Sequence, residues 1–174
     1  MNLQILAQQY KDFFLDVEYH IYTKSEEIIL KGKPNNFLHL TGLQQCLSPR
    51  IDVSQFYFDC LNGKYGDIKS LLTRIKDKTI KNKIYIKTDY FSNIQNAILL
   101  SSDLFFKDKI DYGICSPFVI GNKVKFHTVL FVYNDDCGFC VPKSNQVDMS
   151  KDFSNVIKHN YGSVPITKIE VIKQ

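Results

Sequence analysis

The stretch Asn36-Phe37-Leu38-His39-Leu40-Thr41-Gly42-Leu43 carries an imidazole and a hydroxyl inside a short apolar run. We expect it to form a β-strand, in which side chains alternate between two faces. Phe37, His39 and Thr41 would then share one face, and Leu38 would point to the other. The stretch is either a catalytic edge or a core strand whose polar groups are satisfied, and spacing alone leaves both interpretations open.

Length and composition bound the rest of the chain. The 174 residues are 44% hydrophobic, which suits one domain over 1–174 with a substantial core. The net charge of +4 permits an anionic partner without requiring one. Arg50 and Arg74 are the only arginines. A nucleic-acid site would therefore depend on lysine charges and aromatic stacking instead of guanidinium forks.

Targeting and cysteine patterns point to the cytoplasm. The N-terminus lacks the positive cluster and apolar core of a secretory signal, and no stretch approaches about 20 apolar residues, so we expect no membrane association. Five cysteines without a signal favour reduced thiols. Cys137 and Cys140 form a CxxC, but it lies in an expected hairpin turn and has no second pair. We favour a plain turn over a redox or zinc site.

Periodicity and turn residues predict an α+β domain with a twisted, mainly antiparallel sheet packed by several helices. The expected helices cover 2–16, 54–61, a segment beginning near Asp67, a segment after Ser92, and 153–157. The expected strands cover 18–24, 27–31, 36–43, 83–88, 111–119, 123–133, 139–141 and 164–173, and 143–160 is expected to be mainly loop. Gly121-Asn122 is a two-residue turn of the kind that joins twisted hairpin strands.

The strand expected at 123–133 has two different faces. Lys125, His127, Val129, Phe131 and Tyr133 alternate onto one face. The other face is wholly apolar apart from one threonine, and we expect it to be the core face. The mixed face either binds single-stranded RNA by stacking and charge or is a half-covered sheet face.

Metal-independent RNA cleavage needs one group that takes the 2′-hydroxyl proton, one that protonates the leaving oxygen, and cations that hold the phosphate. The chain has no P-loop, GxGxxG, HExxH or GxSxG motif. The candidate catalytic residues are His39, Thr41, Tyr22 and His127. The candidate substrate-binding residues are Lys31, Lys125 and Tyr133. We expect no metal and no cofactor.

Three segments carry a family resemblance: Tyr19–Thr23, Ile28–Leu30 and Asn36–Leu43. Together they resemble the phage Barnase–EndoU–colicin–RelE-like (PBECR) nuclease families, most closely the fourth subgroup with its F-x-H-L-T-G-type motif. The resemblance implies a BECR-like fold, with N-terminal helices on a twisted antiparallel sheet, and RNase chemistry in phages, mobile elements and toxins. It supports His39 and Thr41 alone as site residues.

Three functional hypotheses follow. The first is a cytoplasmic, metal-independent endoribonuclease of phage or mobile-element origin whose partner is RNA. The alternative is a non-catalytic protein of the same origin that binds and inhibits a host defence or nucleic-acid complex. The third is an ADP-ribosyltransferase using Tyr22, Thr23 and His39, although no glutamate stands in a clear catalytic strand context.

Overall fold

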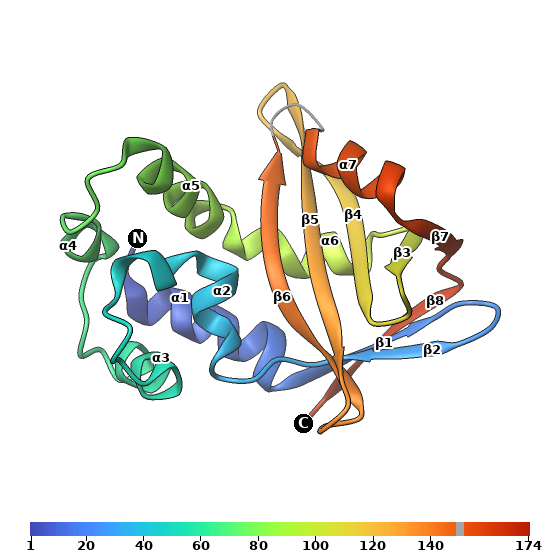
Figure 1. Ribbon diagram of the computed structural model, residues 1–174, viewed down its shortest axis with the longest axis horizontal. Coiled ribbons are helices and arrows are strands. Elements are labelled where there is room, and N and C mark those ends of the chain that lie inside the picture. The colour runs from blue at the N-terminus through green and yellow to red at the C-terminus, as the bar shows by residue number, and fades with distance from the viewer. Residues whose placement is uncertain (149–151) are drawn as a thin grey trace.

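The computed structural model describes residues 1–148 and 152–174 (Figure 1). The α-helices are α1 (Leu3–Tyr10), α2 (Asn36–Thr41), α3 (Val53–Leu61), α4 (Ile68–Leu72), α5 (Lys78–Asp89), α6 (Ile94–Leu99) and α7 (Asp152–Asn160). A π-helix η1 (Lys11–Leu15) extends α1, and η2 (Leu43–Cys46) and η3 (Phe91–Asn93) are 3₁₀ turns. Among the described residues, no helix is long and apolar enough to cross a membrane.

The strands are β1 (Val17–Tyr22), β2 (Glu27–Leu30), β3 (Asp103–Lys107), β4 (Asp111–Ile120), β5 (Lys123–Asn134), β6 (Phe139–Asp148), β7 (Gly162–Pro165) and β8 (Lys168–Lys173). They form one curled sheet in the order β7-β3-β4-β5-β6-β2-β1-β8. All pairings are antiparallel except β2–β6, whose register has the single pair Leu30 and Cys140. The predicted α+β class with a mainly antiparallel sheet is confirmed.

Helices cover both faces of the central strands. In Figure 1, α1 to α5 lie to one side of β6, while α6 passes behind β4 and β5 and α7 lies in front of them. On the α7 side, a Cβ added to Gly113 would lie 2.9 Å from Leu130 and 3.8 Å from Ile157 of α7. The main core lies on the other face, beneath the N-terminal helices.

The face expected to be the core side of β5 is the wrong one. Lys125, His127, Val129 and Phe131 are buried under the helical layer. On the opposite face, the apolar residues are half-buried or, in the case of Val124, exposed. The reason is that α6 packs on the mixed face and supplies apolar cover there. The polar side chains of this face are therefore part of the core.

The stretch Asn36–Leu43 forms helix α2 and not the expected strand. Phe37, Leu38, Leu40 and Thr41 are all buried, which a helix surrounded by other elements permits and a strand with one buried face does not. Phe37 and Thr41, one turn apart, share the buried side. His39 points away from them and is exposed.

Aromatic packing fixes the position of α2. The ring of Phe37 packs edge-on against Tyr10 of α1 and Tyr57 of α3, with centroids 5.5 and 5.4 Å away. Tyr10 also donates through its hydroxyl to the carbonyl oxygen of Lys33, 2.6 Å away, just before the helix. A Cβ at Gly32 would lie 2.6 Å from this hydroxyl, so only glycine permits so close an approach.

The segment 83–88 is also helical, as part of α5, and not a strand. Asp77 caps this helix by accepting from the backbone N–H groups of Thr79 and Ile80, and Ile84 is buried one turn after Ile80. The β-branched composition of this segment favours a strand. The segment is helical because residues spaced four apart, such as Ile80 and Ile84, pack on one side of α5.

Four other differences concern the second half of the chain. β3 was not predicted, and β6 continues to Asp148 where a loop was expected. The expected strand 164–173 is two strands, because β7 pairs with β3 and β8 pairs with β1. The short helix near 153–157 is present as the longer α7.

Candidate functional site

His39 is the accessible residue of the motif. Leu40 and Thr41 beside it are fully buried, whereas the imidazole is exposed on the outer side of α2. Within residues 1–148 and 152–174, its ring has no hydrogen-bond or ion-pair partner. Gly42 follows with a φ of 79° and ends the helix. The motif therefore presents one free imidazole on an otherwise buried turn.

A cavity of about 240 Å³ adjoins the end of α2. Its lining residues are Gly42, Gln44, Gln45, Ile80, Lys83, Ile84, Lys87 and Gln146. They come from η2, from one stripe of α5 and from the C-terminal half of β6. A Cβ at Gly42 would lie 3.4 Å from Lys87 Cδ, so the lysine stem packs directly against the end of the motif. His39 is not among these lining residues; it lies in the last turn of α2, three positions before Gly42.

Two unpaired lysines give this cavity a positive field. Lys83 is exposed and Lys87 is half-buried. Burial, and then repulsion from Lys83, lower the pKa of Lys87. In the described part of the chain, neither ammonium group has an ion-pair partner. Two like charges held without a counter-ion favour an anionic ligand.

His127 and Thr41 have structural roles. Asn145 of β6 accepts a hydrogen bond from Nε2 of His127 and donates from Nδ2 to the carbonyl oxygen of Leu40, 3.3 Å away. His127 is fully buried, and burial lowers its pKa to about 4. Thr41 donates to the carbonyl oxygen of Phe37 at 2.8 Å. The Asn145 amide joins α2 to the sheet, Thr41 bonds within α2, and both Thr41 and His127 are fully buried.

Lys125 and Tyr133 lie far apart on β5. Lys125 is 6% exposed and donates from Nζ to the hydroxyl of Tyr90, 2.7 Å away. Tyr133 is 40% exposed near the other end of the strand. Eight residues separate them, or about 26 Å at the rise of a β-strand. They do not form one substrate-binding surface.

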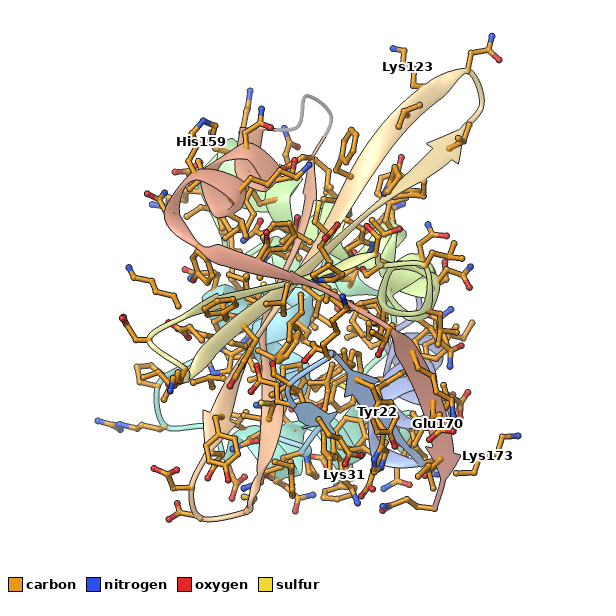
Figure 2. All side chains as sticks on the ribbon, turned by 90° about the vertical axis from the view of Figure 1, so that its right-hand side faces the viewer. Tyr22, Lys31, Lys123, His159, Glu170 and Lys173 are labelled. Carbon is orange, nitrogen blue, oxygen red and sulfur yellow. The ribbon has the colours of Figure 1, made fainter. Side chains whose placement is uncertain are left out.

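Tyr22 and Lys31 lie on a third surface, the outer face of β1, β2 and β8. Figure 2 shows both with Glu170 of β8 on one side of the molecule, and Figure 1 places the Tyr22 end of β1 far from α2. Tyr22 donates to Glu170 at 3.0 Å, and Lys31 donates to Glu18 at 2.9 Å. The structure therefore places Tyr22 and Lys31 on the same face, at opposite ends of the β1–β2 pair, and separates this face from His39.

The sequence did not single out His20 and its carboxylates on this outer face. His20 Nδ1 lies 2.5 Å from Glu27 Oε1, and its Nε2 lies 3.5 Å from Glu18 Oε2. Hydrogen bonds to Lys31 and His20 lower the pKa of Glu18 and Glu27 respectively. The hydrogen bond to Glu170 raises the pKa of Tyr22 to about 12. The charged forms of Glu18 and Glu27 are therefore favoured, and the Tyr22 hydroxyl keeps its proton.

Sequence reasoning also missed Lys83, Lys87 and Gln146. The two lysines were assigned to a strand, which hid the stripe they form with Ile80 and Ile84. Two features of the sequence indicate a helix here: Asp77 is a residue type that caps helices, and Ile80 and Ile84 are four residues apart. Among the described residues, no three His, Cys, Asp or Glu side chains gather with the geometry of a metal site, and Cys137 and Cys140 are free thiols.

The chain thus combines an α+β fold and a curled, mainly antiparallel sheet with a lysine-lined cavity that adjoins the C-terminal end of α2. Comparison with family models matches residues 2–164 to PBECR4, the phage-Barnase-EndoU-ColicinE5/D-RelE like nuclease4 family. The chain belongs to this family, as the resemblance predicted. No curated protein and no solved structure matches it.

Proposed function

We propose that the protein is a metal-independent endoribonuclease whose reacting groups lie at the end of α2, beside the cavity. The observation that carries this proposal is the exposed imidazole of His39 in the last turn of α2, a helix whose capping residue Gly42 lines a cavity with Lys83 and Lys87, in a chain of a nuclease family. The family's name also supports a phage or mobile-element origin.

The proposed reaction is an internal transfer at phosphorus. His39 takes the proton of a ribose 2′-hydroxyl, and the 2′-oxygen bonds to the adjacent phosphorus atom. The bond from phosphorus to the 5′-oxygen breaks, and that oxygen takes a proton. The products are a 2′,3′-cyclic phosphate and a 5′-hydroxyl.

Lys87 is the proposed proton donor to the leaving oxygen. Its pKa is lowered by burial and by Lys83, which brings a lysine closer to the range where it transfers protons. Lys83, exposed at the mouth, is proposed to hold the phosphate and to stabilise the charge that develops on its oxygens.

Electrostatics favour this surface over the outer face of β1, β2 and β8. The outer face carries three carboxylates, Glu18, Glu27 and Glu170, against Lys31 and Lys168. A polyanion gains little there, because both lysines already pair with glutamates. The lysines of the cavity have no such competitor.

The test is cleavage of single-stranded RNA in EDTA, with the product ends identified by mass. We expect His39→Ala to lower kcat/KM by about 100-fold or more, and the matched DNA strand to remain intact. Cleavage by His39→Ala at the wild-type rate would contradict the site assignment. Failure of the wild type to cleave any RNA would contradict the proposed endoribonuclease activity.

Two substitutions separate the roles of Lys87. Lys87→Arg keeps the charge but cannot release a proton near neutral pH, so kcat should fall while KM stays near the wild-type value. Lys87→Met should impair both constants. Lys78→Met removes a charge from the same helix outside the cavity and serves as the control. Equal activity of Lys87→Arg and wild type would contradict the proton-donor role.

A further inference from the structure

The cavity beside α2 has an uncharged half that phosphate binding does not require. Ile80 and Ile84 of α5 form an apolar wall, and three glutamines, Gln44, Gln45 and Gln146, complete the lining. A phosphate site needs cations and N–H groups, and gains nothing from an isoleucine wall. The composition therefore points to a ligand with an apolar face and a polar edge.

The glutamine amides have unused hydrogen-bonding capacity. Gln44 Oε1 is buried and has no partner, which leaves an acceptor without a donor. Gln146 donates from Nε2 to the hydroxyl of Ser144 at 3.3 Å and keeps its own oxygen available. Gln45 is exposed at the rim, and no bond to its side chain is recorded in the described part of the chain. A buried acceptor without a donor costs about 1–3 kcal/mol, which a ligand N–H group can recover.

An unpaired nucleobase has the matching chemistry. Its flat face packs on apolar side chains, and its edge offers amino or imino N–H donors beside acceptors, which amides recognise. The cations Lys83 and Lys87 line the same cavity, so a base placed against the isoleucines would have its own phosphate within reach of lysine.

We infer that this cavity is a base-binding subsite for a single-stranded RNA nucleotide next to the cleaved phosphate. Ile80 and Ile84 contact the face of the base, Gln44 and Gln146 bind its edge, and Lys83 and Lys87 bind its phosphate. The inference rests on the proposed function for the identity of the polymer. Binding of a nucleotide at the cavity can be measured without any cleavage.

The experiment titrates the full-length His39→Ala protein with the four ribonucleoside 5′-monophosphates, ribose 5-phosphate and inorganic phosphate, and follows amide shifts by NMR. At least one nucleotide should bind about tenfold more tightly than ribose 5-phosphate, with shifts at 42–45, 80–87 and 146. Equal affinity of ribose 5-phosphate and all four nucleotides, or shifts elsewhere only, would overturn the inference.

Two substitutions test the roles of the two halves. Gln146→Leu should lower the affinity for the preferred nucleotide about fivefold or more and leave the affinity for ribose 5-phosphate unchanged. Lys83→Met should lower both affinities. Gln55→Leu, on an exposed position of α3, is the control, and an unchanged amide spectrum away from the cavity shows that each variant folds. Unchanged nucleotide affinity in Gln146→Leu would contradict base recognition.

The outcomes separate this inference from the proposed function. Nucleotide binding with no RNA cleavage by the wild type would keep the subsite and overturn the nuclease. RNA cleavage without nucleotide discrimination, in binding or in cut-site preference, would keep the nuclease and overturn the subsite.

Discussion

Asn145 of β6 and Leu40 of α2 are joined by a hydrogen bond of 3.3 Å from the amide Nδ2 to the backbone carbonyl oxygen. The residues are 105 positions apart in the chain. The other side of the same amide holds His127. One buried side chain thus ties the turn that presents His39 to the centre of the sheet.

Replacing this amide should destabilise the fold. Asn145→Leu leaves the N–H of His127 and the carbonyl of Leu40 buried without partners, so we expect a loss of about 2–4 kcal/mol in the free energy of unfolding. Urea denaturation at neutral pH measures it. Asn155→Leu, exposed on α7, should change stability by less than about 0.5 kcal/mol. Equal free energies of unfolding for the two variants would show that the Asn145 amide does not stabilise the fold.

The burial of His127 predicts a loss of stability in mild acid. Its folded pKa is about 4, below the usual 6.5 of histidine, so the unfolded chain binds more protons between these values. The contribution is fully present above pH 6.5 and falls as pH drops toward 4, by up to about 3 kcal/mol. The difference in unfolding free energy between pH 7 and pH 4.5 should shrink in His127→Gln. It should not change in His159→Gln, which alters an exposed residue of α7 (Figure 2).

Gly42 offers a test of the contact between α2 and α5. Gly42→Ala and Gly121→Ala both place a side chain at positive φ, so each should cost about 1–2 kcal/mol of stability. A Cβ at Gly42 meets Lys87 at 3.4 Å, whereas one at Gly121 meets nothing within 4 Å. Nucleotide affinity should therefore fall in Gly42→Ala alone. A similar loss in Gly121→Ala would mean that the effect comes from reduced stability.

Substitutions on the outer face of β1 and β8 should leave RNA cleavage nearly unchanged. Tyr22→Phe removes the hydroxyl bonded to Glu170, and Glu170→Gln removes that carboxylate. We expect kcat/KM within about twofold of wild type for both, because catalytic proton transfer is worth about 10²–10⁴-fold and neither group contacts the cavity. A hundredfold loss in Tyr22→Phe would move the active centre to the outer face.

Most of the fold could be predicted from local sequence features such as turn residues and helix caps. The Gly121-Asn122 turn, flanked by alternating strands, correctly predicted the β4–β5 hairpin. The sequence offers Asp52 or Ser54 as the cap of α3, and in the structure Asp52 caps it by accepting from the N–H of Gln55. The motif stretch was assigned to the wrong structure because its apolar residues fit both periods, and the partners that bury it come from distant segments such as α1 and α3.

The candidate site was less predictable than the fold. His39 could be singled out from its motif. Lys83 and Lys87 could not, because they become cavity-lining residues only through the packing of α5 against Gly42. The grouping of Tyr22 with His39 was a guess about strand neighbours. Residues 36–41 are helical, so they do not pair with β1 as that grouping required. The alternation of residues within a strand does not reveal which strands are neighbours.

The single parallel pair between Leu30 and Cys140 divides the sheet into two cooperative parts. On the β2 side, the N–H of Lys31 donates to the carbonyl oxygen of Cys140 at 3.0 Å. Strands β4, β5 and β6, in contrast, are joined by long ladders. In backbone terms, the β1-β2-β8 ribbon can open without unzipping the rest, so its amides should exchange with deuterium sooner than those of β4 and β5. The cavity beside α2 borders β6, on the side of the sheet with the long ladders, so we expect the amides around it to exchange later than those of the ribbon.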